Sequence, residues 1–95
     1  MILEDVKREL RVSNSAFDTE IQGLIEAALI DLRIPPIQVD KIVDTDPLMK
    51  RAIILYCKAN SVFSEAADAE RYQRSYDNLV EKLSLSLLYK DVSET

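Results

Sequence analysis

Few side chains in this 95-residue sequence are of the types that carry out chemistry. It has no histidine and one cysteine, Cys57, which excludes Ser-His-Asp and Cys-His catalytic arrangements, an intramolecular disulfide and a cysteine-based zinc site. Its one glycine, Gly23, cannot supply the glycine-rich loop that cradles a phosphate. We therefore expect neither an enzyme nor a protein that holds a cofactor or a metal.

Two groups of residues still invite a chemical interpretation. Cys57 lies in an apolar run next to Lys58, which favours a buried structural cysteine over a reactive thiol. Asp40, Asp44 and Asp46 are close enough in sequence to suggest a calcium site. Their spacing is not that of an EF-hand loop, and the glycine that such a loop requires is absent. A solvated loop followed by a helix cap is the favoured explanation.

Binding to nucleic acid or to an acyl chain finds little support. Tyr72 and Tyr76 lie one helical turn apart and could stack on bases, but an ordinary core-facing stripe has the same spacing, and the flanking charges are mixed. A helix-turn-helix across residues 13–15 would present an acidic helix that repels phosphate. An acyl carrier needs a serine in an Asp-Ser-Leu context, which the sequence lacks.

Composition places the chain among ordinary globular proteins. Apolar residues make up 47% and charged residues 31%, with a formal net charge of −5. The length suits one domain over residues 1–95. The apolar run from Ala52 to Cys57 is far shorter than the roughly 20 residues of a membrane span, and Glu4 and Asp5 do not fit a secretory signal. We expect no membrane association and a reducing cytoplasm.

The elements that position these residues are predicted to be helical. Apolar periodicity predicts helices over residues 2–11, 16–33, 47–62 and from 65 to at least 83, which gives a small single-domain all-α bundle of about four helices. Ser15 and Asp18 predict a capping box, and Asp46 followed by Pro47 predicts a capped helix start. Residues 37–45 fit either a short helical turn or an extended loop.

Two segments carry more apolar surface than four short helices need. The helix over 47–62 is apolar almost all round, which is typical of a helix buried centrally or by a partner. Apolar residues first alternate after Leu83, which predicts an extended C-terminal arm over residues 84–95, with a frayed last helical turn as the alternative. The surplus indicates either a well-filled core or a subunit interface. The candidate interface residues are Ile54, Leu85, Leu87, Leu88 and Tyr89.

Several blocks of the sequence together resemble a known family. They are LEDVK at residues 3–7, FDTEIQGLIEAA at 17–28, DPLMKRAIILYCKAN at 46–60, AERYQRSY at 69–76, and the Leu-Ser run that ends near Tyr89. In this order and spacing they resemble the head–tail connector proteins of tailed bacteriophages and prophages, which are small helical head-completion adaptors. No block is a catalytic fingerprint, and residues 35–43 match least.

The resemblance implies a structural protein of the virion neck, made in the cytoplasm of the bacterial host. Such subunits form a ring under the portal, following its twelvefold symmetry, and bind the next neck or tail component. The ring extends the channel through which DNA passes without sequence-specific binding, and a net negative charge suits such a conduit. We expect the arm from Ser84 to dock on a neighbouring subunit or on the portal. The alternative function is a small helical regulatory or binding module that acts on a bacterial partner as a monomer or dimer.

Overall fold

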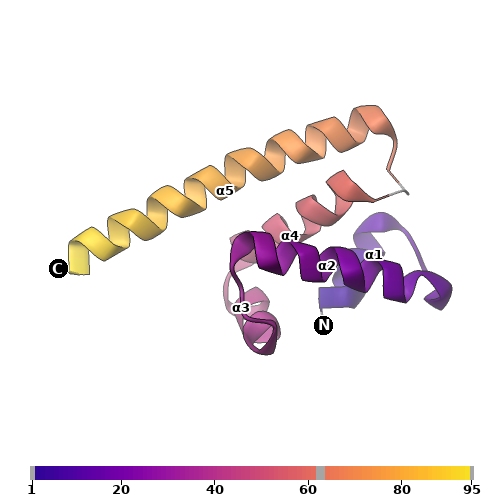
Figure 1. Cartoon of the computed structure of the whole chain (residues 1–95), viewed down its shortest axis with the longest axis horizontal. Helices are drawn as coiled ribbons and strands as arrows, with labels where there is room; N and C mark the ends of the chain where they lie inside the picture. Colours follow the sequence, from indigo (N-terminus) through magenta and orange to yellow (C-terminus); the bar gives the residue numbers. More distant parts are fainter. Residues whose placement is uncertain (1, 62–63, 95) are drawn as a thin grey trace.

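Helices are the one type of regular secondary structure in the part of the chain that the structure describes. The computed structural model (Figure 1) covers residues 2–61 and 64–94. The α-helices are α1 (Ile2–Leu10), α2 (Asp18–Leu32), α3 (Val39–Thr45), α4 (Pro47–Asn60) and α5 (Ala66–Glu94), with short 3₁₀ turns at Ser15–Phe17 and Pro36–Gln38. The predicted all-α class is confirmed. The additional helix α3 forms from the segment whose pattern fitted either a helical turn or a loop.

The start of α4 is fixed by the predicted cap. The Asp46 side chain accepts hydrogen bonds from the backbone N–H groups of Leu48 at 3.1 Å and Met49 at 3.3 Å. Pro47 occupies the first helical position, where its missing N–H costs nothing and its fixed φ angle suits the helix. The Asp-Pro pair therefore ends α3 and begins α4 within two residues.

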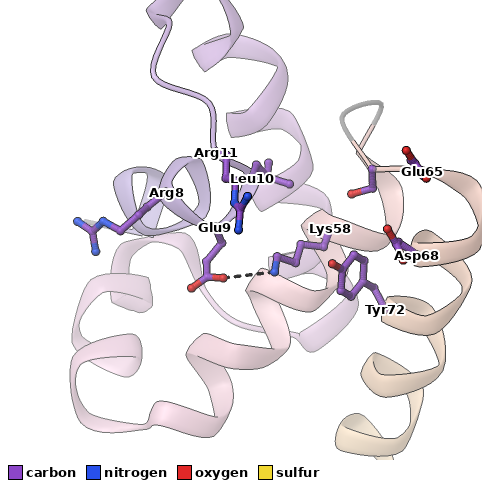
Figure 2. A pocket seen from close by; sticks show the side chains of 9 residues that line it. Arg8, Glu9, Leu10, Arg11, Lys58, Glu65, Asp68 and Tyr72 are labelled. Atoms are coloured by element: carbon purple, nitrogen blue, oxygen red, sulfur yellow. Dashed lines mark ion pairs between the residues drawn. The ribbon is translucent and has the colours of Figure 1, made fainter.

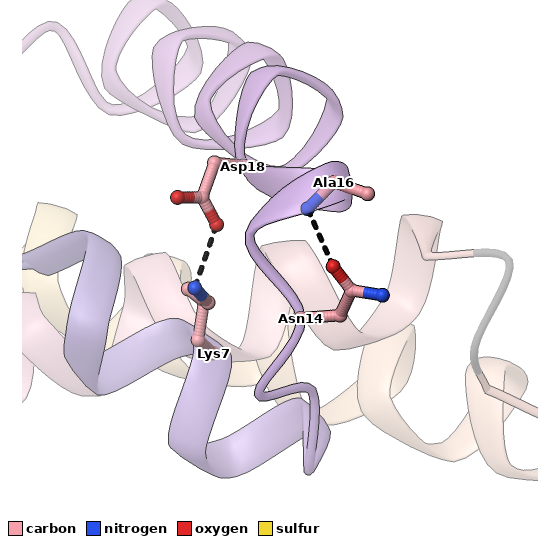
Figure 3. A network of polar contacts seen from close by, with 4 residues as sticks. All are labelled: Lys7, Asn14, Ala16 and Asp18. Carbon is pink, nitrogen blue, oxygen red and sulfur yellow. Dashed lines mark hydrogen bonds and ion pairs between the residues drawn. The ribbon is translucent and has the colours of Figure 1, made fainter.

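The start of α2 differs from the predicted capping box. A 3₁₀ turn precedes α2, so Ser15 lies inside this turn and not at the cap position. Asn14 caps the turn instead, since its side-chain oxygen accepts a hydrogen bond from the N–H of Ala16 at 2.8 Å. The Asp18 carboxylate lies 2.7 Å from the Lys7 ammonium and so joins α2 to α1 (Figure 3).

Helix α4 occupies the centre of the molecule. Helices α1, α2 and α3 pack against it, and α5 also packs against it. The buried side chains contributed mainly by the first four helices form one cluster, which we call the body core. Its members are Ile2, Val6, Ile21, Ile25, Ala28, Leu29, Ile34, Val43, Ile53 and Cys57. The apolar side chains of α4 are thus buried mainly against other helices of the same chain. For this helix, the surplus of apolar surface predicted from the sequence is explained by a filled core.

A second, smaller cluster attaches α5 to the body. Ala52 and Leu55 of α4 and Tyr76 of α5 are its buried members, and Tyr72, Leu79, Val80 and Leu83 extend it along α5. The rings of Tyr56 and Tyr76 meet edge to face with centroids 5.4 Å apart. The Tyr76 hydroxyl donates a hydrogen bond to the carboxylate of Asp31 at the end of α2. We call this set the α5 cluster.

The C-terminal segment is helical, and the predicted extended arm over residues 84–95 is wrong for residues 84–94. Helix α5 has 29 residues and α4 has 14, which correspond to lengths of about 43 Å and 21 Å. The C-terminal half of α5 therefore runs past the end of α4 (Figure 1). No glycine or proline follows Leu83, and extending an existing helix is easier than starting a new structure. Thr95 lies outside the described residues.

Candidate interaction site

The candidate catalytic thiol is inaccessible. Cys57 is fully buried in the body core, and this burial raises the pKa of its thiol to about 12. At neutral pH the side chain is a protonated thiol that cannot act as a nucleophile. The predicted structural role of Cys57 is confirmed.

The tyrosines considered for base stacking are buried or partly covered, and Asp46 of the candidate calcium site caps a helix. Tyr76 is only 3% exposed, so its ring is unavailable to a base, and Tyr72 is partly covered by the Lys58 ammonium 4.9 Å from its ring centroid. Asp46 caps α4. Within residues 2–61 and 64–94, no three side chains of metal-binding type come together as a possible site. No helix in the same part of the chain has the length and apolar character to span a membrane.

The predicted interface residues fall in two places. Ile54 is partly buried on α4, where it packs against the body core and also borders a surface hollow. Leu85, Leu87, Leu88 and Tyr89 belong to the backbone of the C-terminal half of α5. The side chains of these four residues lie outside what the structure describes.

Three large apolar side chains that the sequence did not single out are exposed. Ile30 near the end of α2 is 79% exposed, Ile37 in the second 3₁₀ turn is 93% exposed, and Leu48 at the start of α4 is 52% exposed. Ile30 was detectable, since it lies off the apolar face of its helix. Ile37 and Leu48 follow prolines at chain turns, where periodicity gives no information about burial.

A groove lies between α1, α4 and α5. It consists of two open hollows that share Glu9, Lys58 and Tyr72. Figure 2 shows the hollow next to Arg8 and Arg11. Six cationic residues line them, compared with the three carboxylates of Glu9, Glu65 and Asp68. We call it the cationic groove. Its cations are Arg8, Arg11, Lys50, Arg51, Lys58 and Arg71. In a chain with a net charge of −5, this is a local reversal of sign.

The cations of the groove are only weakly engaged within the chain. The Lys58 ammonium lies 3.3 Å from the Glu9 carboxylate (Figure 2), and Asp5 is shared between Lys50 at 3.3 Å and Arg8 at 3.6 Å. Arg71 pairs with Asp68 on its own helix at the surface. Ion pairs at the surface of a protein contribute about 0–1 kcal/mol each. A carboxylate from outside the chain can therefore compete for these cations at little cost.

The fold and these surfaces define a class of protein: a small all-helical domain with exposed apolar and cationic surfaces and with its one thiol buried. Comparison with known families agrees with this class. A family model described as "Phage connector protein" matches residues 2–90, so this chain belongs to the phage connector protein family. No curated protein and no solved structure gives a significant match.

Membership confirms the resemblance in the sequence. The connector family is structural, and its membership implies association with other head and tail components at the neck of the virion. The match covers the four described helices of the body and most of α5. The matched region therefore includes the C-terminal half of α5 up to residue 90.

Proposed function

We propose that this connector assembles as a ring beneath the portal, extends the DNA channel and joins the head to the tail. The observation that carries the proposal is the length of α5. This helix has 29 residues and the helix it packs on has 14, so it is about 22 Å longer. A helix that is longer than the helix it packs on within the chain is well placed to reach a neighbouring subunit or the portal.

In this proposal the chain acts as a single domain, residues 1–95, and has no chemistry of its own. The end of α5, with Leu85, Leu87, Leu88 and Tyr89, docks on a neighbour or on the portal. Ile54 contributes where it borders the cationic groove. Copies follow the twelvefold symmetry of the portal, and the next neck component binds the far side of the ring. DNA passes through the lumen without sequence-specific contacts.

Deletion of residues 84–95 tests the role of the α5 end. The truncated chain should remain helical and fold cooperatively, because among the described side chains the body core contains no residue of α5, and the deletion keeps Tyr72, Tyr76, Leu79, Val80 and Leu83 of the α5 cluster. It should fail to join heads to tails. Native mass spectrometry and negative-stain images should show closed rings for the full chain and no closed rings for the truncated chain. Infectious particles completed by the truncated chain would refute this role.

A pair of matched variants separates loss of contact from loss of the segment. Leu85→Ser with Leu88→Ser removes apolar surface, and Ser84→Ala with Ser86→Ala changes the same number of residues in the same segment while keeping the leucines. We expect the first variant to fail in head completion and the second to behave as the natural chain. Equal activity of the two variants would exclude an apolar docking contact at these positions.

The oligomeric state separates this function from the alternative. A regulatory module would form a saturating dimer at every concentration and would not bind a portal. A connector that is a monomer in isolation should still be retained by purified portal rings.

A further inference from the structure

The charges of α2 and α4 are segregated by sign. Helix α2 carries the carboxylates of Asp18, Glu20, Glu26 and Asp31 and contains no lysine or arginine. Helix α4 carries Lys50, Arg51 and Lys58 and contains no aspartate or glutamate. The other long helix, α5, mixes both signs along its length. A net charge of −5 therefore conceals one acidic helix and one basic helix.

The charges of α2 and α4 form no ion pairs with each other among the described residues of the chain. Among the described residues, no ion pair joins α2 to α4. Asp18 pairs with Lys7 of α1, and Asp31 accepts the hydrogen bond of Tyr76. Lys50 and Lys58 pair with residues of α1. The α2 residues Glu20 and Glu26 are exposed and make no ion pair with any residue that the structure describes.

Two arginines of the cationic groove are likewise exposed and have no ion-pair partner among the described residues. Arg11 and Arg51 line the groove and are exposed. Neither makes an ion pair with a described residue. No residue of α2 lines the groove. The acidic helix and the groove are therefore two separate surfaces of one chain.

We propose that the cationic groove of one connector subunit receives the exposed acidic face of α2 from the next copy in the ring. This inference rests on the proposed ring and names the contact that builds it. The axial spacing of the charges is similar: Glu20 and Glu26 lie about 9 Å apart along α2, and Arg51 and Lys58 lie about 10 Å apart along α4. Around α2, Glu20 and Glu26 are about 120° apart, so they mark the two edges of its exposed face. Helices α2 and α4 also match in length, with 15 and 14 residues.

The contact is heterologous, because the two surfaces lie on different elements. A contact of this type leaves one acidic face and one groove open in every pair, so assembly continues until a ring closes. Charge complementarity across such a contact fixes the partner and the register, since like charges brought together are strongly unfavourable. Ile54, which borders the groove, provides apolar area within the same contact.

Two charge-reversal variants test the proposal. The groove variant carries Arg11→Glu with Arg51→Glu, and the α2 variant carries Glu20→Lys with Glu26→Lys. None of these four residues makes an ion pair with a described residue, so the substitutions leave the known pairs of the fold in place. Each variant alone should need at least about 100-fold more protein to assemble, because like charges then face each other.

Mixing the variants gives the decisive result. In an equimolar mixture, the natural α2 of the groove variant meets the natural groove of the α2 variant, and the two reversed surfaces meet each other with opposite signs. Assembly should recover to near the natural level in rings of alternating composition. The control matched to the groove variant, Arg74→Glu with Lys82→Glu, makes the same change in net charge as that variant at exposed positions of α5 outside the groove. It should assemble as the natural chain does.

Assembly is measured by sedimentation and native mass spectrometry at low and high salt, and by infectivity when each variant, or both together, replaces the connector in its own phage. Loss in the single variants with recovery in the mixture supports the contact. If the natural chain and both variants form rings equally, the contact is wrong and the connector function stands. If the natural chain forms no ring in solution or in particles, the proposed ring fails. Salt-dependent DNA binding that only the groove variant loses, with unchanged assembly, would assign the groove to DNA and overturn the proposal.

Discussion

Replacement of Tyr76 should release α5 while the body stays folded. Tyr76 is the one buried side chain that α5 contributes to either cluster among the described residues. Its ring packs on Ala52, Leu55 and Tyr56, and its hydroxyl reaches Asp31. It therefore ties α5 to both α4 and α2.

The size of the effect follows from these contacts. Truncation of a buried aromatic residue to alanine costs about 3–5 kcal/mol, and we take the lower end because the α5 cluster is small and near the surface. Tyr76→Phe removes only the hydroxyl, and since Asp31 is exposed and can be hydrated, we expect a loss of about 1 kcal/mol. Tyr76→Ala should therefore cost about three times as much as Tyr76→Phe.

Hydrogen exchange followed by mass spectrometry reads this effect helix by helix. A loss of about 3 kcal/mol corresponds to opening that is more frequent by a factor of about 100. Peptides from α5 of Tyr76→Ala should exchange faster by this factor, and peptides from α1 and α2 should keep their protection because no described side chain of α5 belongs to the body core.

The control is Gln73→Ala on the same helix. Gln73 makes only an exposed hydrogen bond to Asp77, so its loss should change exchange little. If α1 and α2 lose protection together with α5 in Tyr76→Ala, the chain is one cooperative unit. The division into a body core and an α5 cluster would then be wrong as a description of its energetics.

Three further predictions concern single residues. Asp46→Ala should lower the free energy of unfolding by about 1 kcal/mol through loss of the α4 cap, and Asp46→Asn should lose much less, as thermal melts can show. Gly23→Ala should stabilise the fold by about 0.5–1 kcal/mol, because an added Cβ meets nothing within 4 Å and the residue lies within α2. Burial raises the pKa of Cys57 from 9.0 to about 12. Well below pH 9 the thiol is protonated in both the folded and the unfolded chain, whereas between pH 9 and 12 it ionises mainly in the unfolded chain. The contribution of this thiol should therefore lower the free energy of unfolding by about 2 kcal/mol from pH 9 to 11. Urea titrations across this range should show a smaller fall in Cys57→Ala.

The sequence predicts the helices well where local chemistry determines their ends. Asp46 and Pro47 identify the start of α4 without any tertiary information. The many apolar residues of α4 indicated burial either centrally or by a partner, and the fold shows the central position. The capping box at Ser15 was wrong because Asn14 caps the 3₁₀ turn that contains Ser15, and Asp18 pairs with Lys7 on another helix. A salt bridge between elements is invisible to a rule about neighbours in sequence.

The C-terminal segment shows a different limit. The alternation from Ser84 to Leu87 covers four residues, too few to outweigh a helix that already runs from Ala66. The propagation of an existing helix decided the structure there, and local pattern did not. The candidate site was also only partly accessible from sequence. The pattern pointed to apolar residues at Ile54 and beyond Leu83, whereas the cationic groove forms from residues of three helices that only the fold brings together.

The segregation of charge changes what the acidity of the chain means for a DNA channel. The argument that a net negative charge lets DNA slide assumes that the charge is spread evenly around the subunit. Here α2 is purely acidic and α4 purely basic. If these surfaces meet between neighbouring copies, their charges neutralise each other at the contact and neither faces the lumen. The potential that DNA experiences would then depend on the remaining helices, and on α5 in particular, whose charges are mixed. A reversal of charge on α5 that leaves assembly intact, such as Arg74→Glu with Lys82→Glu, would change the passage of DNA only if α5 lines the channel.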